Sequence, residues 1–145
     1  MQKLREQQLS AVIAGLSQPV LGICLGLQLL ADRSDEDNAR CLGIIPGVAR
    51  KLDASPSTPV PNTGWCAVTY VREHPLIEGI ASGSYFYFVH SYAIPVSGFT
   101  VATAAHAAPF SAIATRQNFL ATQFHPERSA SAGARLLANF LSMSS

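Results

Sequence analysis

The chain has few of the features that mark membrane, secreted or metal-binding proteins. Its three cysteines, Cys24, Cys41 and Cys66, are widely spaced, and no Cys-x-x-Cys pair occurs. This pattern argues against a zinc site and against a disulfide framework, so we expect no metal and a cytoplasmic, reducing environment. No apolar run approaches the ~18 residues that a membrane span needs, and the polar start of the chain does not resemble a signal peptide.

The chain also has few charged residues and almost no excess of one sign. Only 13% of the residues are charged, the formal net charge is +1, and no run of Lys or Arg occurs. We therefore expect no nucleic-acid partner. The 145 residues are 48% hydrophobic, which is enough for one packed domain, and we expect a single domain over residues 1–145.

The apolar pattern predicts an α/β domain with a mixed sheet. Apolar residues between Leu4 and Leu16 repeat at helical spacing, so the chain is expected to open on one amphipathic helix. Residues 20–23 form a short apolar run that is typical of a strand buried on both faces. Further helices are expected at residues 25–31 and 129–141. Strands are expected at residues 48–52, 66–71, 85–89, 100–103, 111–115 and 119–124.

The segment Gly22-Ile-Cys24-Leu-Gly26 has the form of a nucleophile elbow, a sharp turn from strand to helix that exposes one reactive side chain. A helix beginning at Leu25 would favour the thiolate of Cys24, and the Leu25 N–H would form half of an oxyanion hole. The alternative is that Cys24 is a buried, inert side chain. Cys41 and Cys66 lack this context, and we interpret both as structural.

The segment Gln123-Phe-His125-Pro-Glu127 places an imidazole and a carboxylate two residues apart. Glu127 is positioned to bond one ring nitrogen of His125 and fix its tautomer, which completes the parts of a cysteine nucleophile triad. The alternative is an ordinary surface histidine. His90 ends an aromatic run, so the polar segment from His90 to Tyr92 is a candidate lining of a pocket. His74 is expected to be a solvated loop side chain.

These motifs together resemble the class I, triad-type glutamine amidotransferases. Within that class, Tyr87-Phe-Val-His-Ser-Tyr92 and Gly64-Trp65 resemble the glutaminase subunits of imidazole glycerol phosphate synthase, in histidine biosynthesis. The likeness implies a flavodoxin-like α/β fold with a mixed, largely parallel sheet flanked by helices. Family members carry further strands, and a loop with a second oxyanion donor, before the segment that matches Met1. By this resemblance we expect the present domain to be N-terminally incomplete.

The resemblance also implies roles for individual residues. Cys24 would attack the side-chain amide of glutamine, His125 would carry the proton, and Glu127 would orient His125. Ammonia would pass to a (β/α)₈-barrel cyclase subunit in a heterodimer, and no cofactor is implied. The positions implied to hold glutamine are Gln28, Ser91 and Tyr92, and those implied to face the barrel are Trp65 and Arg128. The chain departs from the usual family residues at Asn62, Thr63, Cys66, His106, Ala107 and Ala121.

Two alternative functions stay open at this point. One is a catalytically impaired form of the same fold that only binds the partner. The other is a different class I amidotransferase or another thiol hydrolase. Trp65 and the segment from Tyr87 to Tyr92 argue against the second alternative.

Overall fold

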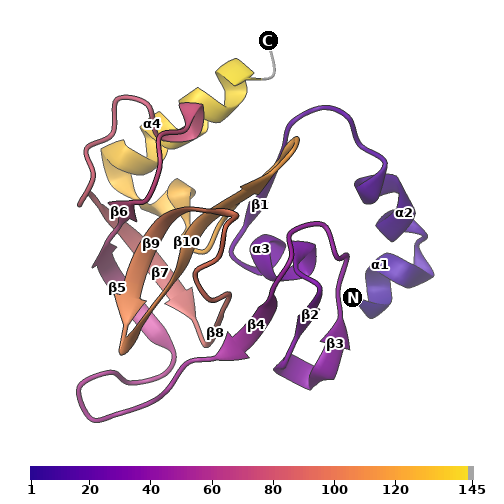
Figure 1. The fold of residues 1–145 in the computed structure, drawn as a ribbon, viewed down its shortest axis with the longest axis horizontal. Helices are drawn as coiled ribbons and strands as arrows, with labels where there is room; N and C mark the ends of the chain where they lie inside the picture. Colours follow the sequence, from indigo (N-terminus) through magenta and orange to yellow (C-terminus); the bar gives the residue numbers. More distant parts are fainter. Residues whose placement is uncertain (144–145) are drawn as a thin grey trace.

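A computed structural model describes residues 1–143, and the last two residues of the predicted domain lie outside this range. A twisted sheet forms the centre of the molecule, with α4 on one side and α1 and α2 at the opposite end (Figure 1). The five strands of this sheet have the order β1-β11-β10-β9-β6. Their bounds are β1 Val20–Ile23, β6 Thr69–Tyr70, β9 Thr100–His106, β10 Ala108–Arg116 and β11 Phe119–Thr122.

Two smaller sheets and four α-helices complete the described fold. One smaller sheet has four strands in the order β3-β2-β4-β8, and the other pairs β5 with β7. These strands are β2 Arg33–Ser34, β3 Ala39–Arg40, β4 Val48–Lys51, β5 Asn62–Ala67, β7 Tyr85–His90 and β8 Tyr92–Ala93. The helices are α1 Gln2–Glu6, α2 Leu9–Ala14, α3 Leu25–Leu30 and α4 Ala130–Met143, with short 3₁₀ turns η1 Glu36–Asn38, η2 Pro75–Ile77 and η3 Pro126–Arg128.

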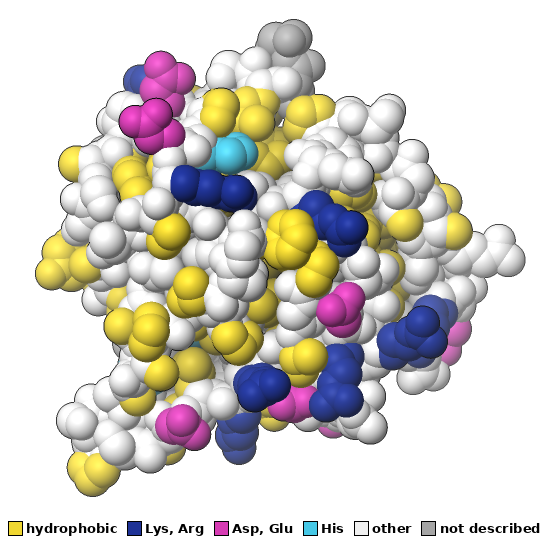
Figure 2. Space-filling model, in the orientation of Figure 1, with side chains coloured by type: hydrophobic (Ala, Val, Ile, Leu, Met, Phe, Trp, Pro, Cys, Tyr) yellow, Lys and Arg dark blue, Asp and Glu magenta, His cyan; other side chains and the backbone are white. Residues whose placement is uncertain are grey.

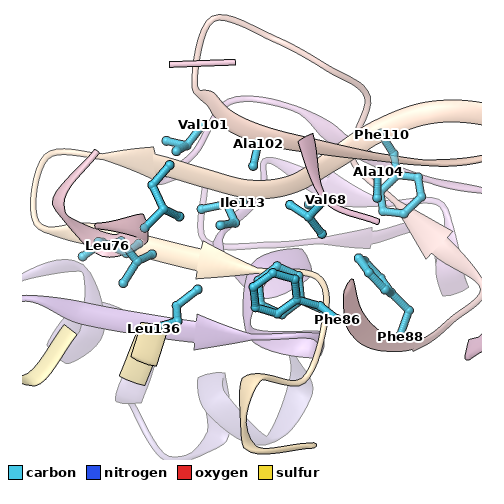
Figure 3. Close-up of a cluster of buried hydrophobic side chains, with 14 of the residues drawn as sticks. Val68, Leu76, Phe86, Phe88, Val101, Ala102, Ala104, Phe110, Ile113 and Leu136 are labelled. Carbon is cyan, nitrogen blue, oxygen red and sulfur yellow. The ribbon is translucent and has the colours of Figure 1, made fainter. Parts of the chain in front are cut away.

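The core consists of two apolar clusters. In the larger cluster, Phe86 and Phe88 of β7 point toward Val68 and Phe110, and Leu136 of α4 packs on the same cluster (Figure 3). The smaller cluster lies around α3. Alternate residues of β7 are buried, which is the period-two pattern of a strand with one face against the core. Strand β7, which leads to the sequence His90-Ser-Tyr92, is therefore packed firmly against the core.

The expected α/β class and mixed sheet are confirmed, but the sheet is not largely parallel. Among the strand pairs of residues 1–143, only β1–β11 and β2–β4 are parallel. Tight connections at Ala107 and Gln117, where the chain takes positive φ values of 63° and 54°, join β9 to β10 and β10 to β11. Such short connections can only join antiparallel neighbours.

The start of the chain also differs from the prediction. The expected single helix is broken into α1 and α2 because Gln8 has a left-handed backbone with φ 56°. Neither helix contains a buried residue, so neither contributes substantially to the core. Strand β1 is half-buried along its length, whereas burial on both faces was expected. Residues 66–71 are divided between β5 and β6.

Across the described residues, every helix is too short or too polar to traverse a lipid bilayer.

Candidate active site

Cys24 lies in a strained turn between β1 and α3. Its backbone has φ 51° and ψ −100°, a conformation that non-glycine residues rarely adopt. A Cβ on Gly22 would lie 2.9 Å from the backbone carbon of Gly26, so this turn requires glycine at position 22. At Gly26 a Cβ would meet open space. The expected elbow geometry is thus present, with Gly22 as the glycine that permits it.

The sheet brings the Cys24 and His125 segments to one edge. Strands β1 and β11 are parallel, with Ile23 opposite Thr122, so Cys24 and His125 leave the same ends of two neighbouring strands. The backbone N–H of Cys24 donates to the carbonyl of Thr122 at 2.7 Å. The Gln123 side-chain amide donates to Cys24 Sγ at 3.8 Å. The C-terminal ends of parallel strands are the usual site position in α/β sheets.

The imidazole of His125 is oriented by Glu127. His125 Nδ1 lies 2.7 Å from Glu127 Oε1, within the turn η3 that also carries Arg128. Because a carboxylate accepts only, Nδ1 carries the proton, and in the neutral ring Nε2 has the free lone pair. The backbone of His125 is fixed as well, since its N–H donates to the Tyr87 carbonyl at 2.9 Å. This is the geometry of a general base with its orienting acid.

Burial raises the pKa of the Cys24 thiol above its ordinary value. The Leu25 backbone N–H and the Gln123 amide both lower this pKa by bonding the sulfur, while the negative charge of Glu127 raises it. The Leu25 N–H thus acts in the expected direction, but desolvation outweighs the hydrogen bonds, and the pKa of the thiol is raised overall. The thiol donates to the Val89 carbonyl at 3.7 Å. A neutral thiol of this kind needs a base before it can act as a nucleophile.

Two of the three residues implied to hold glutamine are in contact. Gln28 lies on α3, one turn after Cys24, and is 6% exposed. Its Nε2 donates to the backbone carbonyl of Tyr92 at 3.3 Å. Ser91 is half-buried, and its carbonyl accepts from Leu52 N. The main chain of residues 91–92 is therefore held next to the helix that begins directly after Cys24.

Three polar residues around the site, Gln123, Ser129 and Asn62, were not assigned a role from the sequence. Gln123 and Ser129 belong to the motif that contains His125, yet the pattern gave no indication that both side chains turn inward. Asn62 and His90 are buried and bonded to each other, Nδ2 to Nε2, at 3.0 Å. His90, which begins the segment expected to be a candidate pocket lining, is therefore engaged in a buried pair in the described structure. Such pairs depend on tertiary contacts that local sequence patterns do not reveal.

The remaining histidines lie outside the site. His74 is not simply solvated, since its Nδ1 accepts from Leu76 N at 3.1 Å and caps η2. His106 bonds the Pro59 carbonyl at 2.7 Å. A cavity of about 740 Å³ runs along the segment from Tyr70 to Ile80 and is lined by none of the triad residues. In residues 1–143 no cluster of His, Cys, Asp or Glu is placed to hold a metal ion.

An aromatic face lies on the outer side of β5 and β7. Trp65 and Tyr87 are cross-strand neighbours with ring centroids 6.0 Å apart, and the Arg128 guanidinium lies 4.3 Å above the Tyr87 ring. Trp65 is 51% exposed and Tyr85 is 62% exposed. Figure 2 shows hydrophobic side chains on the left of one face, where Figure 1 places β5 and β9, with charged groups at the upper left, across the centre and along the lower edge.

Comparison with known proteins identifies the family. The family described as "Glutamine amidotransferase class-I" matches residues 4–143. The chain belongs to the class-I glutamine amidotransferases. A protein of Pasteurella multocida named imidazole glycerol phosphate synthase subunit HisH is 49% identical over 141 residues, which is 97% of this chain and 71% of that protein.

Solved structures of amidotransferases share the fold. A glutamine amidotransferase of Thermotoga maritima superposes with a TM-score of 0.63 at 19% identity, over 95% of this chain and 53% of that one. The glutaminase domain of Trypanosoma brucei CTPS with bound acivicin gives a TM-score of 0.60 at 15% identity, over 92% and 64%. This amidotransferase chain thus spans between about half and three quarters of the length of the proteins compared here.

Proposed function

We propose that this chain is the glutamine-hydrolysing subunit of imidazole glycerol phosphate synthase, with Cys24 as nucleophile, His125 as base and Glu127 as the orienting acid. The observation that carries the proposal is the elbow at Cys24, whose strand lies parallel to the strand that leads to the His125–Glu127 pair. The 49% identity to a subunit HisH supports the choice of subunit within the family.

In the proposed reaction His125 Nε2 takes the thiol proton of Cys24, and the sulfur attacks the side-chain carbonyl carbon of glutamine. His125 then donates that proton to the leaving nitrogen. Ammonia departs, and a γ-glutamyl thioester remains on Cys24. Water attacks the thioester with His125 again as base, which releases glutamate and restores the thiol. The raised pKa of the Cys24 thiol supports this order, because the resting sulfur is protonated and the base is required.

The groups around the sulfur suggest how substrate is held. The Leu25 N–H, which is directed at Sγ, is proposed as one oxyanion donor for the tetrahedral intermediate. Gln28, Ser91 and Tyr92 are proposed to bind the amino-acid end of glutamine. We propose that residues 1–145 act as one amidotransferase domain, and that the free cysteines reflect a cytoplasmic location.

The partner is proposed to be a (β/α)₈-barrel cyclase subunit that receives the ammonia. The face of β5 and β7 is the proposed contact surface, because the exposed Trp65 meets the half-buried Tyr87 edge to face there and the exposed Arg128 lies over the Tyr87 ring. Aromatic and Arg side chains are the types that contribute most at protein interfaces. Turn η3 carries both Arg128 and the proposed acid Glu127, so this surface adjoins the proposed catalytic pair.

The proposal is tested by co-expression with a barrel cyclase and an assay for ammonia released from glutamine. We expect Cys24→Ala to abolish release while the complex still forms. Cys41→Ala is the matched control, since Cys41 is also half-buried and free but lies away from the elbow, and it should retain activity. A complex that forms but releases no ammonia, with Cys24→Ala indistinguishable from the parent, would leave only a partner-binding role.

A further inference from the structure

A chain of buried hydrogen bonds connects β5 to the helix that follows Cys24. Asn62 on β5 donates from Nδ2 to His90 Nε2 at 3.0 Å. His90 Nδ1 lies 2.9 Å from the Tyr92 carbonyl, and the same carbonyl accepts from Gln28 Nε2 at 3.3 Å. Asn62, His90 and Gln28 are 4%, 5% and 6% exposed. Four residues from β5, β7, β8 and α3 therefore share one continuous network.

The donors and acceptors in this network have a defined direction. A backbone carbonyl can only accept, so His90 Nδ1 carries the ring proton and donates to Tyr92. His90 Nε2 is then the acceptor of the neutral ring, which fits the Asn62 amide that donates to it. The Asn62 amide is itself oriented, because its Oδ1 accepts from the Cys66 thiol at 3.7 Å. One tautomer of His90 satisfies every contact.

The surroundings keep His90 in that neutral form. Its ring lies 5.0 Å from that of Phe110 and 5.6 Å from that of Phe88, centroid to centroid. Burial, together with the nearby His106 and His125, lowers the pKa of His90 to about 4, even though the hydrogen bond to the Tyr92 carbonyl raises it. At neutral pH the ring is therefore uncharged, and both of its nitrogens are occupied by hydrogen bonds.

We propose that His90 is a positioning residue for glutamine binding, because its Nδ1–H holds the Tyr92 carbonyl and through it the Gln28 side chain. The inference rests on the proposed glutaminase function and adds a role for a residue that contacts no substrate. The Tyr92 carbonyl has two lone pairs, and the network fills one with His90 N–H and the other with Gln28. Without the His90 donor, the Tyr92 carbonyl is held by fewer contacts, so Gln28 loses a partner of fixed position.

Two substitutions at one position separate this role from a merely structural one. In His90→Asn the side-chain amide nitrogen occupies the place of Nδ1, so the bond to Tyr92 is kept and the one to Asn62 is lost. In His90→Gln the amide reaches the place of Nε2, so the bond to Asn62 is kept and the one to Tyr92 is lost. Each variant loses one buried hydrogen bond, and thermal unfolding should show similar losses of stability.

The readout is alkylation of Cys24 in the complex of this chain with the barrel cyclase. Acivicin, the ligand in the Trypanosoma brucei structure, probes glutamine recognition, and iodoacetamide probes the thiol alone. We expect His90→Gln to slow acivicin labelling about tenfold and to raise the KM for glutamine similarly, while His90→Asn stays within about twofold of the parent. Iodoacetamide rates and kcat should change little in either variant.

An equal decrease in the rate of acivicin labelling in both variants, in proportion to their losses of stability, would overturn the inference. An unchanged labelling rate in both variants would also overturn it. A parent complex that reacts with iodoacetamide but not with acivicin would instead overturn the proposed function, and the inference with it. NMR of the parent protein gives a second test that needs no variant. The ¹⁵N spectrum should show His90 neutral with its proton on Nδ1, and a proton on Nε2 would contradict the network.

Discussion

The hydroxyl of Ser129 donates to the backbone carbonyl of His125 at 2.6 Å and accepts from the backbone N–H of Tyr87 at 2.9 Å. His125 N–H in turn donates to the Tyr87 carbonyl, which closes a ring of three bonds around one buried hydroxyl. The backbone of the proposed base is thus fixed to a strand that also carries the aromatic face. The position of His125 depends on a side chain that lies four residues further along the chain.

Ser129→Ala should lower both stability and turnover. The change leaves the Tyr87 N–H without its partner and removes one of two donors to the His125 carbonyl, which still accepts from the Arg128 N–H at 3.0 Å. We expect a cost of about 1–3 kcal/mol of unfolding free energy. A displaced His125 backbone should lower kcat roughly tenfold or more, with the KM for glutamine nearly unchanged. Urea unfolding and ammonia release measure the two effects. Ser142→Ala is the control, because Ser142 is exposed and its hydroxyl donates only to the Asn139 carbonyl of the same helix, so the change should have little effect.

Gly22→Ala should destabilise the elbow, while Gly26→Ala should not. A Cβ at Gly22 would lie 2.9 Å from the Gly26 backbone and 3.1 Å from a methyl of Leu30, and the resulting overpacking costs about 1–3 kcal/mol. A Cβ at Gly26 meets open space inside a helix, where Ala is preferred by about 0.5–1 kcal/mol. Chemical denaturation of the two variants should therefore shift in opposite directions. Equal losses would contradict this reading of the turn.

Features that depend on a few adjacent residues were predictable from the sequence. The elbow at Cys24 requires a short apolar run, a glycine at position 22 and a helical pattern after it, and all three are local. The β10–β11 hairpin at Gln117 and the last helix were predictable for the same reason. These elements place Cys24 and His125 each at the end of a strand, whereas the neighbourhood of the two strands depends on the long-range pairing of β1 with β11.

Features that depend on tertiary contacts were not predictable. Asn62 and His90 are 28 residues apart and pair only because β5 lies beside β7. The antiparallel direction of β9 and β10 depends on a tight turn at Ala107, a residue type that gives no turn signal. The raised pKa of Cys24 reflects burial by the folded chain, which exceeds the effect of the short helix at Leu25. Local patterns do not contain this information.

Gln123→Leu should raise the pKa of Cys24 further and yet preserve or improve stability. The Gln123 amide is fully buried, its Oε1 has no hydrogen-bond partner, and its Nε2 lowers the thiol pKa by donating to the sulfur. Replacing a half-satisfied buried amide by leucine removes a desolvation penalty, so the unfolding free energy should stay level or rise by about 1 kcal/mol. The Cys24 thiolate, however, loses the hydrogen bond from the Gln123 amide, so the pKa of the thiol should rise.

The pH profile of Cys24 alkylation by iodoacetamide measures this effect. Because only the thiolate reacts, a raised pKa means that the rate of the parent chain keeps increasing beyond pH 9.0, the ordinary pKa of a thiol. In Gln123→Leu the rate at any pH in the rising part should be lower than in the parent. An unchanged profile would show that the 3.8 Å contact between Gln123 and Cys24 has no effect on the sulfur.

The buried His90 should make the protein less stable as the pH falls from about 6.5 toward 4. In this range the unfolded chain protonates His90 at its ordinary pKa of 6.5, whereas the folded chain, with a pKa of about 4, does not. The unfolded state then binds more protons, so stability rises with pH. The whole difference between the two pKa values corresponds to roughly 3 kcal/mol of unfolding free energy, of which about 2 kcal/mol should be lost between pH 7 and pH 5.

His90→Asn isolates this contribution because it removes the titrating ring and keeps the bond to Tyr92. His74, whose pKa is also lowered by burial, and the carboxylates titrate in both proteins, so their effects cancel in the difference. Urea unfolding at pH 7 and pH 5 should show a loss about 2 kcal/mol smaller in the variant than in the parent. Equal losses would mean that His90 accepts a proton in the folded protein near its ordinary pKa, which the two hydrogen bonds and the surrounding phenylalanines oppose.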